Sequence, residues 1–146
     1  MGKNVLELKK KRVGDKMAKK ILLVMKRKML SDALVEQAKR DSRFDMMAAR
    51  DYSVAVLTAE FSPPDITIVE IPESGPWSSA EKCLGICDAI RRQFPASKQM
   101  ILCNENDSAS CNAAILAKQE NRIDDFVFYD SSIHYLFSKL QALLAT

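Results

Sequence analysis

At residues 65–71 the chain reads Asp65-Ile-Thr-Ile-Val-Glu-Ile71, an apolar run with one acid near its end. The run is rich in β-branched residues, and prolines stand on both sides of it, at positions 63, 64 and 72. This pattern predicts a central strand that is covered on both faces, the kind of strand found in parallel sheets. Because open α/β sheets bind ligands at the carboxyl ends of their strands, Glu70 is predicted to lie at the crevice where chemistry is expected.

Length and composition indicate one ordinary globular domain. The chain has 146 residues, of which 47% are hydrophobic. Its longest apolar runs, at 21–25 and 113–117, fall far short of the roughly 20 residues that a membrane helix needs. No secretory signal stands at the start, so the sequence predicts a cytoplasmic protein. Its four cysteines, at positions 83, 87, 103 and 111, are then expected to be reduced thiols.

Positive charge is concentrated near the start of the chain. Residues 1–28 hold eleven Lys or Arg and two acids, a net charge of +9, whereas the remainder has a net charge of −6. We interpret residues 1–18 as a basic, solvated and disordered leader and 19–146 as the domain, because no aromatic residue interleaves the charges. An arm that binds nucleic acid or a membrane surface is the alternative interpretation.

The first half of the domain alternates between strand and helix patterns. A strand is predicted at 21–25, then a helix capped by Ser31 and running to about 40, then a strand at 44–49. Asp51 is expected to cap the next helix, which ends at about 62 before two prolines. In this helix Val54, Leu57 and Phe61 follow the spacing of an amphipathic helix.

The second half continues the alternation. A helix at 80–94 is expected to be capped by Ser78 or Ser79, and a helix at 109–120 by Asp107 or Ser108. Strands are predicted at 99–104 and 126–129, and a last amphipathic helix begins near residue 131 or 132. Five strands alternating with five helices predict an α/β doubly wound parallel sheet with helices on both faces. The flavodoxin-like strand order 2-1-3-4-5 fits this number of units best.

At this point the chain resembles the receiver domain of bacterial response regulators, the CheY-like domain of two-component systems. The resemblance rests on Lys20-Ile-Leu-Leu-Val24, on the helix, Pro-Asp pair and acid-ended strand of 51–70, on Met100-Ile-Leu-Cys103, and on Asp124-Asp-Phe-Val-Phe-Tyr129. It covers about residues 19–144. It implies a signalling domain of a phosphorelay that works with protein partners and is not itself an enzyme.

The residues that serve phosphorylation in that family are replaced here. Met25 and Lys26 match the two acids that hold magnesium, and neither a thioether nor an ammonium suits that ion. Glu70 matches the phosphoacceptor aspartate, Cys103 the hydroxyl residue of the fourth strand, and Tyr129 the lysine of the fifth. The sequence therefore predicts a degenerate receiver, a pseudo-receiver that accepts no phosphate by the family mechanism and needs no cofactor or metal.

Two hypotheses concern what Glu70 does instead. Lys26 is placed to supply a counter-charge, so that a Glu70–Lys26 salt bridge stands in for acid plus metal. The alternative is that Lys26 points into solvent. Separately, Glu70 could imitate a phosphorylated acceptor and hold the signalling face in an active-like state, although one carboxylate carries less charge than a phosphoryl group.

The resemblance also implies an interaction face, made by the fourth helix, the fifth strand and the fifth helix. Six residues match it: Ile115, Lys118, Phe126, Phe128, Tyr129 and Tyr135. This face is predicted to mediate homodimerisation or docking onto a signalling or transcription partner. The protein is expected to be a stand-alone receiver or a fragment of a longer chain.

Rival classes have less support in the sequence. A flavodoxin-like domain that binds a cofactor or small ligand would share the architecture, yet no Gly-rich phosphate loop follows the first strand. No nucleophile elbow or Cys/His arrangement indicates a hydrolase. His134 is the only histidine, and the pair Cys83 and Cys87 is better explained as core than as a metal or redox site.

Overall fold

The computed structural model describes residues 18–145. It contains one parallel sheet of five strands in the order β2-β1-β3-β4-β5, which confirms the predicted flavodoxin-like order. The strands are β1 (Lys19–Val24), β2 (Phe44–Ala49), β3 (Ile66–Glu70), β4 (Lys98–Cys103) and β5 (Asp125–Phe128). The predicted leader lies outside the described residues, apart from Ala18.

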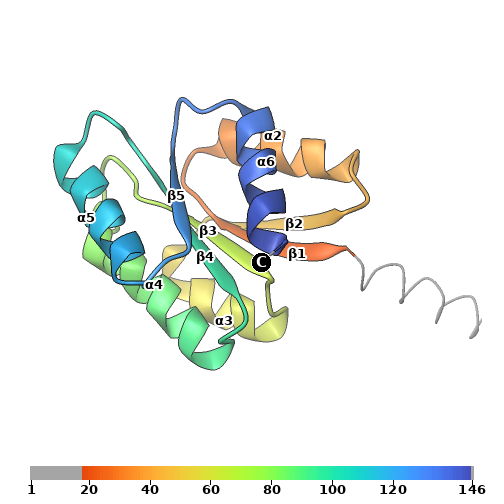
Figure 1. Ribbon diagram of the computed structural model, residues 1–146, viewed down its shortest axis with the longest axis horizontal. Coiled ribbons are helices and arrows are strands. Elements are labelled where there is room, and N and C mark those ends of the chain that lie inside the picture. The colour runs from red at the N-terminus through yellow and green to blue at the C-terminus, as the bar shows by residue number, and fades with distance from the viewer. Residues whose placement is uncertain (1–17, 146) are drawn as a thin grey trace, which may run out of the picture.

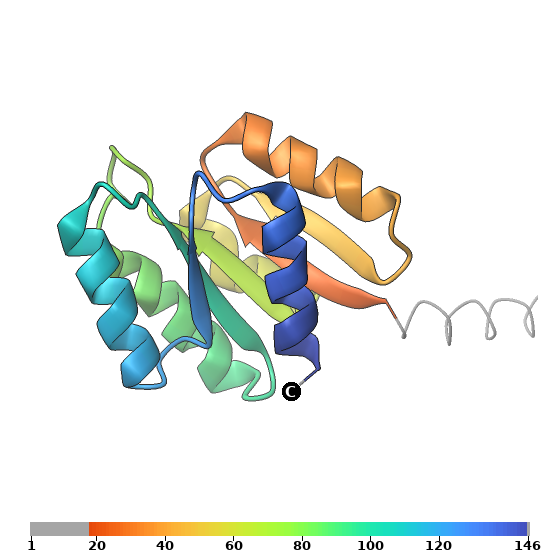
Figure 2. The same ribbon diagram turned by 45° about the horizontal axis from the view of Figure 1, so that its top comes forward.

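Helices cover both faces of the sheet (Figures 1 and 2). They are α2 (Lys28–Lys39), the 3-10 turn η1 (Tyr52–Val54), α3 (Ala55–Phe61), α4 (Ala80–Gln93), α5 (Ser108–Gln119) and α6 (Ile133–Leu144). One core cluster joins α3, α4 and α5 to one face, and a second joins α2 and α6 to the other. None of the helices in residues 18–145 is long and apolar enough to cross a membrane.

Strand β3 occupies the centre of the sheet, as its sequence predicts. It pairs with β1 on one side and with β4 on the other, in both cases parallel. All five of its residues are buried. Successive side chains of a strand point to opposite faces, and accordingly Ile68 belongs to the α2/α6 core while Val69 belongs to the α3/α4/α5 core.

Most helix starts agree with the capping residues read from the sequence. The side chains of Asp51, Ser79, Asp107 and Ser132 each accept a hydrogen bond from a backbone N–H at the start of the following helix. Such bonds satisfy backbone donors that the helix itself leaves without a partner. Ser31 is the exception: α2 begins at Lys28, and the buried Ser31 hydroxyl donates to the backbone oxygen of Lys28 at 3.1 Å.

The apolar spacing of the helix after Asp51 does not mark its buried side. Val54, Leu57 and Phe61 are 41%, 51% and 84% exposed, whereas Ala55 and Ala59 are fully buried. An amphipathic helix usually buries its large apolar residues, but this helix lies against the sheet through its two alanines. Small side chains let the helix backbone approach the sheet, and the larger side chains of this short helix are left outside.

Candidate functional site

Glu70 closes β3 at the carboxyl edge of the sheet, and its side chain is only 1% exposed. Its Oε1 atom accepts hydrogen bonds from the backbone N–H of Lys26, at 2.6 Å, and of Arg27, at 3.0 Å. These two donors belong to the loop between β1 and α2, directly before the first turn of α2. Backbone donors at a helix start favour a negative charge, so the loop forms a cradle for the carboxylate.

Arg27 supplies the positive charge at this carboxylate. Its Nε atom lies 3.3 Å from Oε2 of Glu70, and its terminal nitrogen lies 2.8 Å from Oε1 of Glu73. The guanidinium also lies over the ring of Tyr129, 4.0 Å from the ring centroid. The hypothesis of a Glu70–Lys26 salt bridge is therefore wrong in its cation: Lys26 contributes its backbone N–H, and its side chain is exposed.

Two tyrosines fix the backbone on either side of the Glu70 carboxylate. The buried Tyr52 hydroxyl donates to the backbone oxygen of Glu70 at 2.8 Å, and the Tyr129 hydroxyl donates to the backbone oxygen of Ile71. Burial and the negative charge of Glu70 raise the pKa of both tyrosines. The Cys83 thiol lies 3.6 Å from the same Glu70 oxygen, and burial raises its pKa to about 12. These groups remain protonated donors at neutral pH.

The loop between β3 and α4 is held over the crevice. Glu73 accepts from Arg27 and, at 3.1 Å, from the side-chain amide of Asn104 after β4. Trp77 packs on the ring of Tyr52, with centroids 5.7 Å apart, and lies against the α3/α4/α5 core. What stays open is a shallow hollow of about 460 Å³, lined by Lys26, Arg27, Glu70, Pro72, Glu73, Ser74 and Gly75.

Two of the residues expected at the crevice lie in the core instead. Met25 is 1% exposed and packs in the α2/α6 core. Cys103 is fully buried in the other core, where its thiol lies 3.8 Å from the backbone oxygen of Val127. Both side chains add apolar packing to the cores, at positions where the resemblance implies an acid and a hydroxyl residue.

The residues at this crevice do not fit the magnesium ion that the resemblance implies. A magnesium site needs oxygen ligands with open positions, but the available residues are a buried thioether, an exposed ammonium and a carboxylate paired with Arg27. Within residues 18–145 no group of three or more His, Cys, Asp or Glu side chains is placed to hold a metal ion.

A second hollow, of about 440 Å³, lies along β5 between α5 and α6. Four of the predicted interaction residues line it: Lys118, Phe126, Phe128 and Tyr135. Ile115 is exposed one helical turn before Lys118. Tyr129 belongs to the Glu70 crevice rather than to this face. The structure thus brings five of the six residues to one side of the molecule.

A charged group forms the centre of this face. Asp125 accepts from Lys118 at 3.0 Å and from Lys139 at 2.8 Å. Burial alone would raise the pKa of Asp125, but the hydrogen bonds from Lys139 and Lys118 hold it below its usual range. The aspartate is therefore ionised at neutral pH, and the face carries an excess of one positive charge around it.

Solved structures with this architecture identify the fold. A LuxR-family DNA-binding response regulator from Staphylococcus aureus matches with a TM-score of 0.68 at 20% sequence identity, covering 86% of this chain and 98% of that chain. A response regulator from Thermotoga maritima matches with a TM-score of 0.71 at 17% identity, covering 88% and 99%. The fold is that of a response-regulator receiver domain.

Another matching structure comes from a protein that is described with a different role. A streptococcal protein, described as one of a family of redox sensors that evolved from two-component response regulators, matches with a TM-score of 0.68 at 17% identity. The match covers 86% of this chain and 51% of that chain. No family model matches the sequence, and a search of curated proteins finds no match.

Three residues of the site were not found by reading the sequence: Arg27, Tyr52 and Glu73. Arg27 stands one position after the lysine that was chosen, and both are cations in the same loop. Tyr52 follows the capping Asp51 and could have been flagged as an aromatic residue whose hydroxyl needs a partner when buried. Whether Lys26 or Arg27 turns its side chain toward residue 70 depends on contacts between segments more than forty positions apart in the chain.

Proposed function

We propose that this chain is a receiver-fold signalling module that works without magnesium-dependent phosphorylation. The observation that carries the proposal is the Glu70 carboxylate, in which one oxygen accepts from two backbone N–H groups and the other pairs with Arg27. In-line phosphoryl transfer needs a free, correctly positioned carboxylate oxygen and a metal ion that neutralises the transferred group. Both oxygens of the Glu70 side chain already have partners, and Lys26 and Arg27 stand beside it where a metal ion would need oxygen ligands.

The same contacts favour a built-in charge pair over imitation of a phosphorylated acceptor. Arg27 neutralises Glu70 inside the domain, and the Cys103 thiol is turned to Val127 rather than to the carboxylate. A paired carboxylate projects little field to a distant face, because its charge is balanced within a few ångströms. We infer that Glu70 and Arg27 hold the carboxyl edge of the sheet in one fixed arrangement.

The output of the module is binding of a cytoplasmic protein partner, a signalling or transcription component, through α5, β5 and α6. This surface combines a hollow along β5 with exposed apolar side chains, since Ile115, Leu116 and Tyr135 are 41%, 54% and 48% exposed. Apolar groups rimmed by charge are typical of protein-binding surfaces. A binding role needs no enzymatic chemistry, and the streptococcal redox sensors show that a protein of this fold can serve another input.

Titration with magnesium and beryllium fluoride tests the proposal. We expect the amide resonances of Glu70, Lys26 and Arg27 to stay unchanged in two-dimensional NMR spectra, because the carboxylate oxygens are already engaged. A phosphorylatable receiver domain, titrated in parallel, supplies the positive control. New resonances around residue 70 that depend on both magnesium and beryllium fluoride would overturn the proposal.

A further inference from the structure

Within residues 18–145, several large apolar side chains are left exposed near the β2 end of the sheet. Val54, Leu57 and Phe61 form an outward stripe along η1 and α3. Met47 of β2 is 41% exposed and lines a small hollow with Ser62 and Pro64, the residues that follow the stripe. The segment that follows the stripe thus borders the same hollow as Met47, and exposed apolar side chains of this kind mark sites of association.

Strand β2 also has a free edge. Among residues 18–145 it pairs only with β1, in parallel. The N–H groups of Lys19 and Met25 donate to the backbone oxygens of Arg43 and Ala49. Parallel ladders use alternate residues of each strand, so the odd-numbered residues of β2 face β1. The N–H and C=O groups of Met46 and Ala48 consequently point outward, where no strand of residues 18–145 pairs with them.

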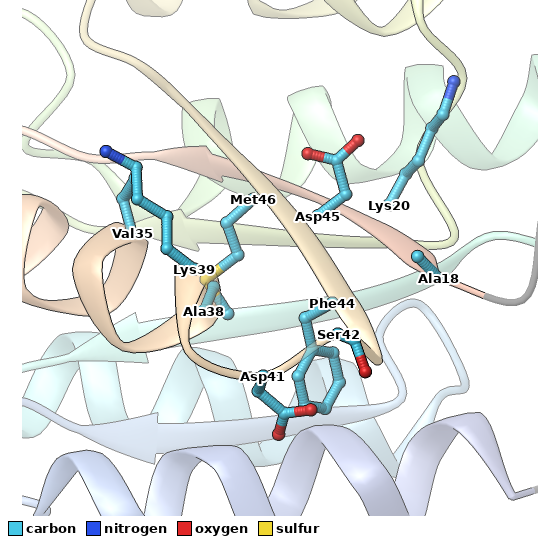
Figure 3. A pocket seen from close by; sticks show the side chains of 10 residues that line it. All are labelled: Ala18, Lys20, Val35, Ala38, Lys39, Asp41, Ser42, Phe44, Asp45 and Met46. Carbon is cyan, nitrogen blue, oxygen red and sulfur yellow. The ribbon is translucent and has the colours of Figure 1, made fainter. Parts of the chain in front are cut away.

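The space beside this edge is open. A hollow of about 670 Å³ runs along the first half of β2 and is lined from both faces of the sheet, by Val35 and Met46 on one side and Lys20 and Asp45 on the other (Figure 3). Natural edge strands are usually protected by charges, prolines or a bulge. In β2 the single charged residue is Asp45, and the strand contains no proline.

We propose that a second copy of this chain pairs with β2, edge to edge and antiparallel, about a two-fold axis near Met46. The two sheets then become continuous through their β2 strands. Antiparallel pairing about this residue sets Asp45 opposite Met47 of the second copy, so the two acids are not forced together as they would be in a register centred on residue 45.

The stripe on α3 is complementary to itself in the same arrangement. A two-fold axis that reverses β2 also reverses α3, so the Phe61 end of one stripe approaches the Val54 end of the other on the same face of the joined sheet. The largest exposed side chain meets the smallest, and Met47 of each copy lies between the strands and the helices. This surface is at the opposite end of the sheet from β5, which leaves the proposed partner face free on both copies.

Hydrogen exchange and sedimentation of the full chain test the inference. We expect self-association in analytical ultracentrifugation, with the amides of Met46 and Ala48 becoming protected from exchange as protein concentration rises. Ala48→Pro removes an outward donor and Phe61→Lys places a charge in the stripe. Each is expected to weaken self-association by about tenfold or more. Far-UV circular dichroism confirms that each variant remains folded.

Ile115→Lys is the matched control, since it adds the same charge to an exposed apolar residue on the β5 side. Self-association that is lost in this variant and kept in Ala48→Pro and Phe61→Lys would move the interface to α5, β5 and α6 and overturn the inference. A chain that sediments as a monomer at all protein concentrations would also overturn the inference. The amides of Met46 and Ala48 could instead be protected from exchange in a monomer and lose this protection when residues 1–17 are deleted. That result would show that the N-terminal segment covers the edge, and it would also overturn the inference.

Discussion

At the scale of single residues, the acid that the resemblance matches to a phosphoacceptor is held by an arginine and by backbone donors. Glu70 is buried, and an unpaired buried carboxylate is costly. Two backbone N–H groups and the Arg27 guanidinium offset this cost. Tyr129 stacks on that guanidinium and Glu73 binds its far side, so the arginine is positioned by several groups at once. In the function that we propose, this charge pair takes the place of a reactive site.

Replacing the arginine should therefore destabilise the fold, whereas replacing the neighbouring lysine should not. We expect Arg27→Met to lower the free energy of unfolding by about 1–3 kcal/mol, at the lower end because Arg27 is half exposed. Lys26→Met should change it by less than about 0.5 kcal/mol, because the backbone N–H of residue 26 is kept. Urea denaturation measures both. Equal losses in the two variants would contradict the assignment of the counter-charge.

At the scale of elements, two helices show that an apolar stripe can be either buried or exposed. In α6 the stripe is the inner face, and Leu136, Phe137 and Leu140 are buried. In α3 the stripe is outside and two alanines make the contact with the sheet. Helix α5 resembles α3 in this respect. Its buried alanines, Ala114 and Ala117, face the core, and its larger residues Ile115 and Leu116 are exposed. Exposed apolar residues thus occur at two separate ends of the sheet.

The partner face is predicted to be sensitive to charge at its exposed apolar positions. We expect Ile115→Lys and Tyr135→Lys each to reduce recovery of specific cross-linked partners by about tenfold or more, because apolar side chains at the centre of an interface dominate affinity. Cross-linking followed by mass spectrometry, with the folded variants added to cell extract, measures this. Leu57→Lys, on the β2 side, is the control. A loss in that variant equal to the loss in Tyr135→Lys would argue against this face.

At the scale of the whole molecule, the two cores hold several weak acids in their protonated form. Burial is the largest cause that raises the pKa of Tyr52, Tyr129, Cys83, Cys87 and Cys103. Four of the five lie in or against the α3/α4/α5 core, and Tyr129 lies against the other. A folded chain with these groups binds protons that the unfolded chain gives up in mildly alkaline solution.

Stability should consequently fall in alkaline solution. Because the folded pKa values lie above the unfolded ones, their contribution is complete below about pH 8.5 and is lost as pH rises toward the folded values, which are about 12 for Cys83 and Cys103. We expect the urea midpoint, measured with a reducing agent, to decline steadily above about pH 9. Tyr129→Phe should make the decline above about pH 10 less steep. Tyr135→Phe, at an exposed tyrosine, should leave it unchanged, and a flat profile in the unmodified chain would contradict the prediction.

The sequence by itself determined the elements and their order. Hydrophobic period, capping side chains and proline positions are local signals. They located the central strand and gave the number of units from which the strand order was inferred. They also located four helix starts, which are capped by Asp51, Ser79, Asp107 and Ser132. They also support the resemblance, which in turn predicts that the residues needed for phosphorylation are replaced.

Only the tertiary structure decided which groups meet. It chose Arg27 over Lys26 as the counter-charge of Glu70, directed Met25 and Cys103 into the two cores, assigned Tyr129 to the crevice, and turned the α3 stripe outward. Spacing along a helix fixes which side chains share a face. It does not fix which face packs on the sheet, because that depends on how closely the backbones of helix and sheet can approach. A pairing across more than forty residues depends in the same way on packing that no local pattern encodes.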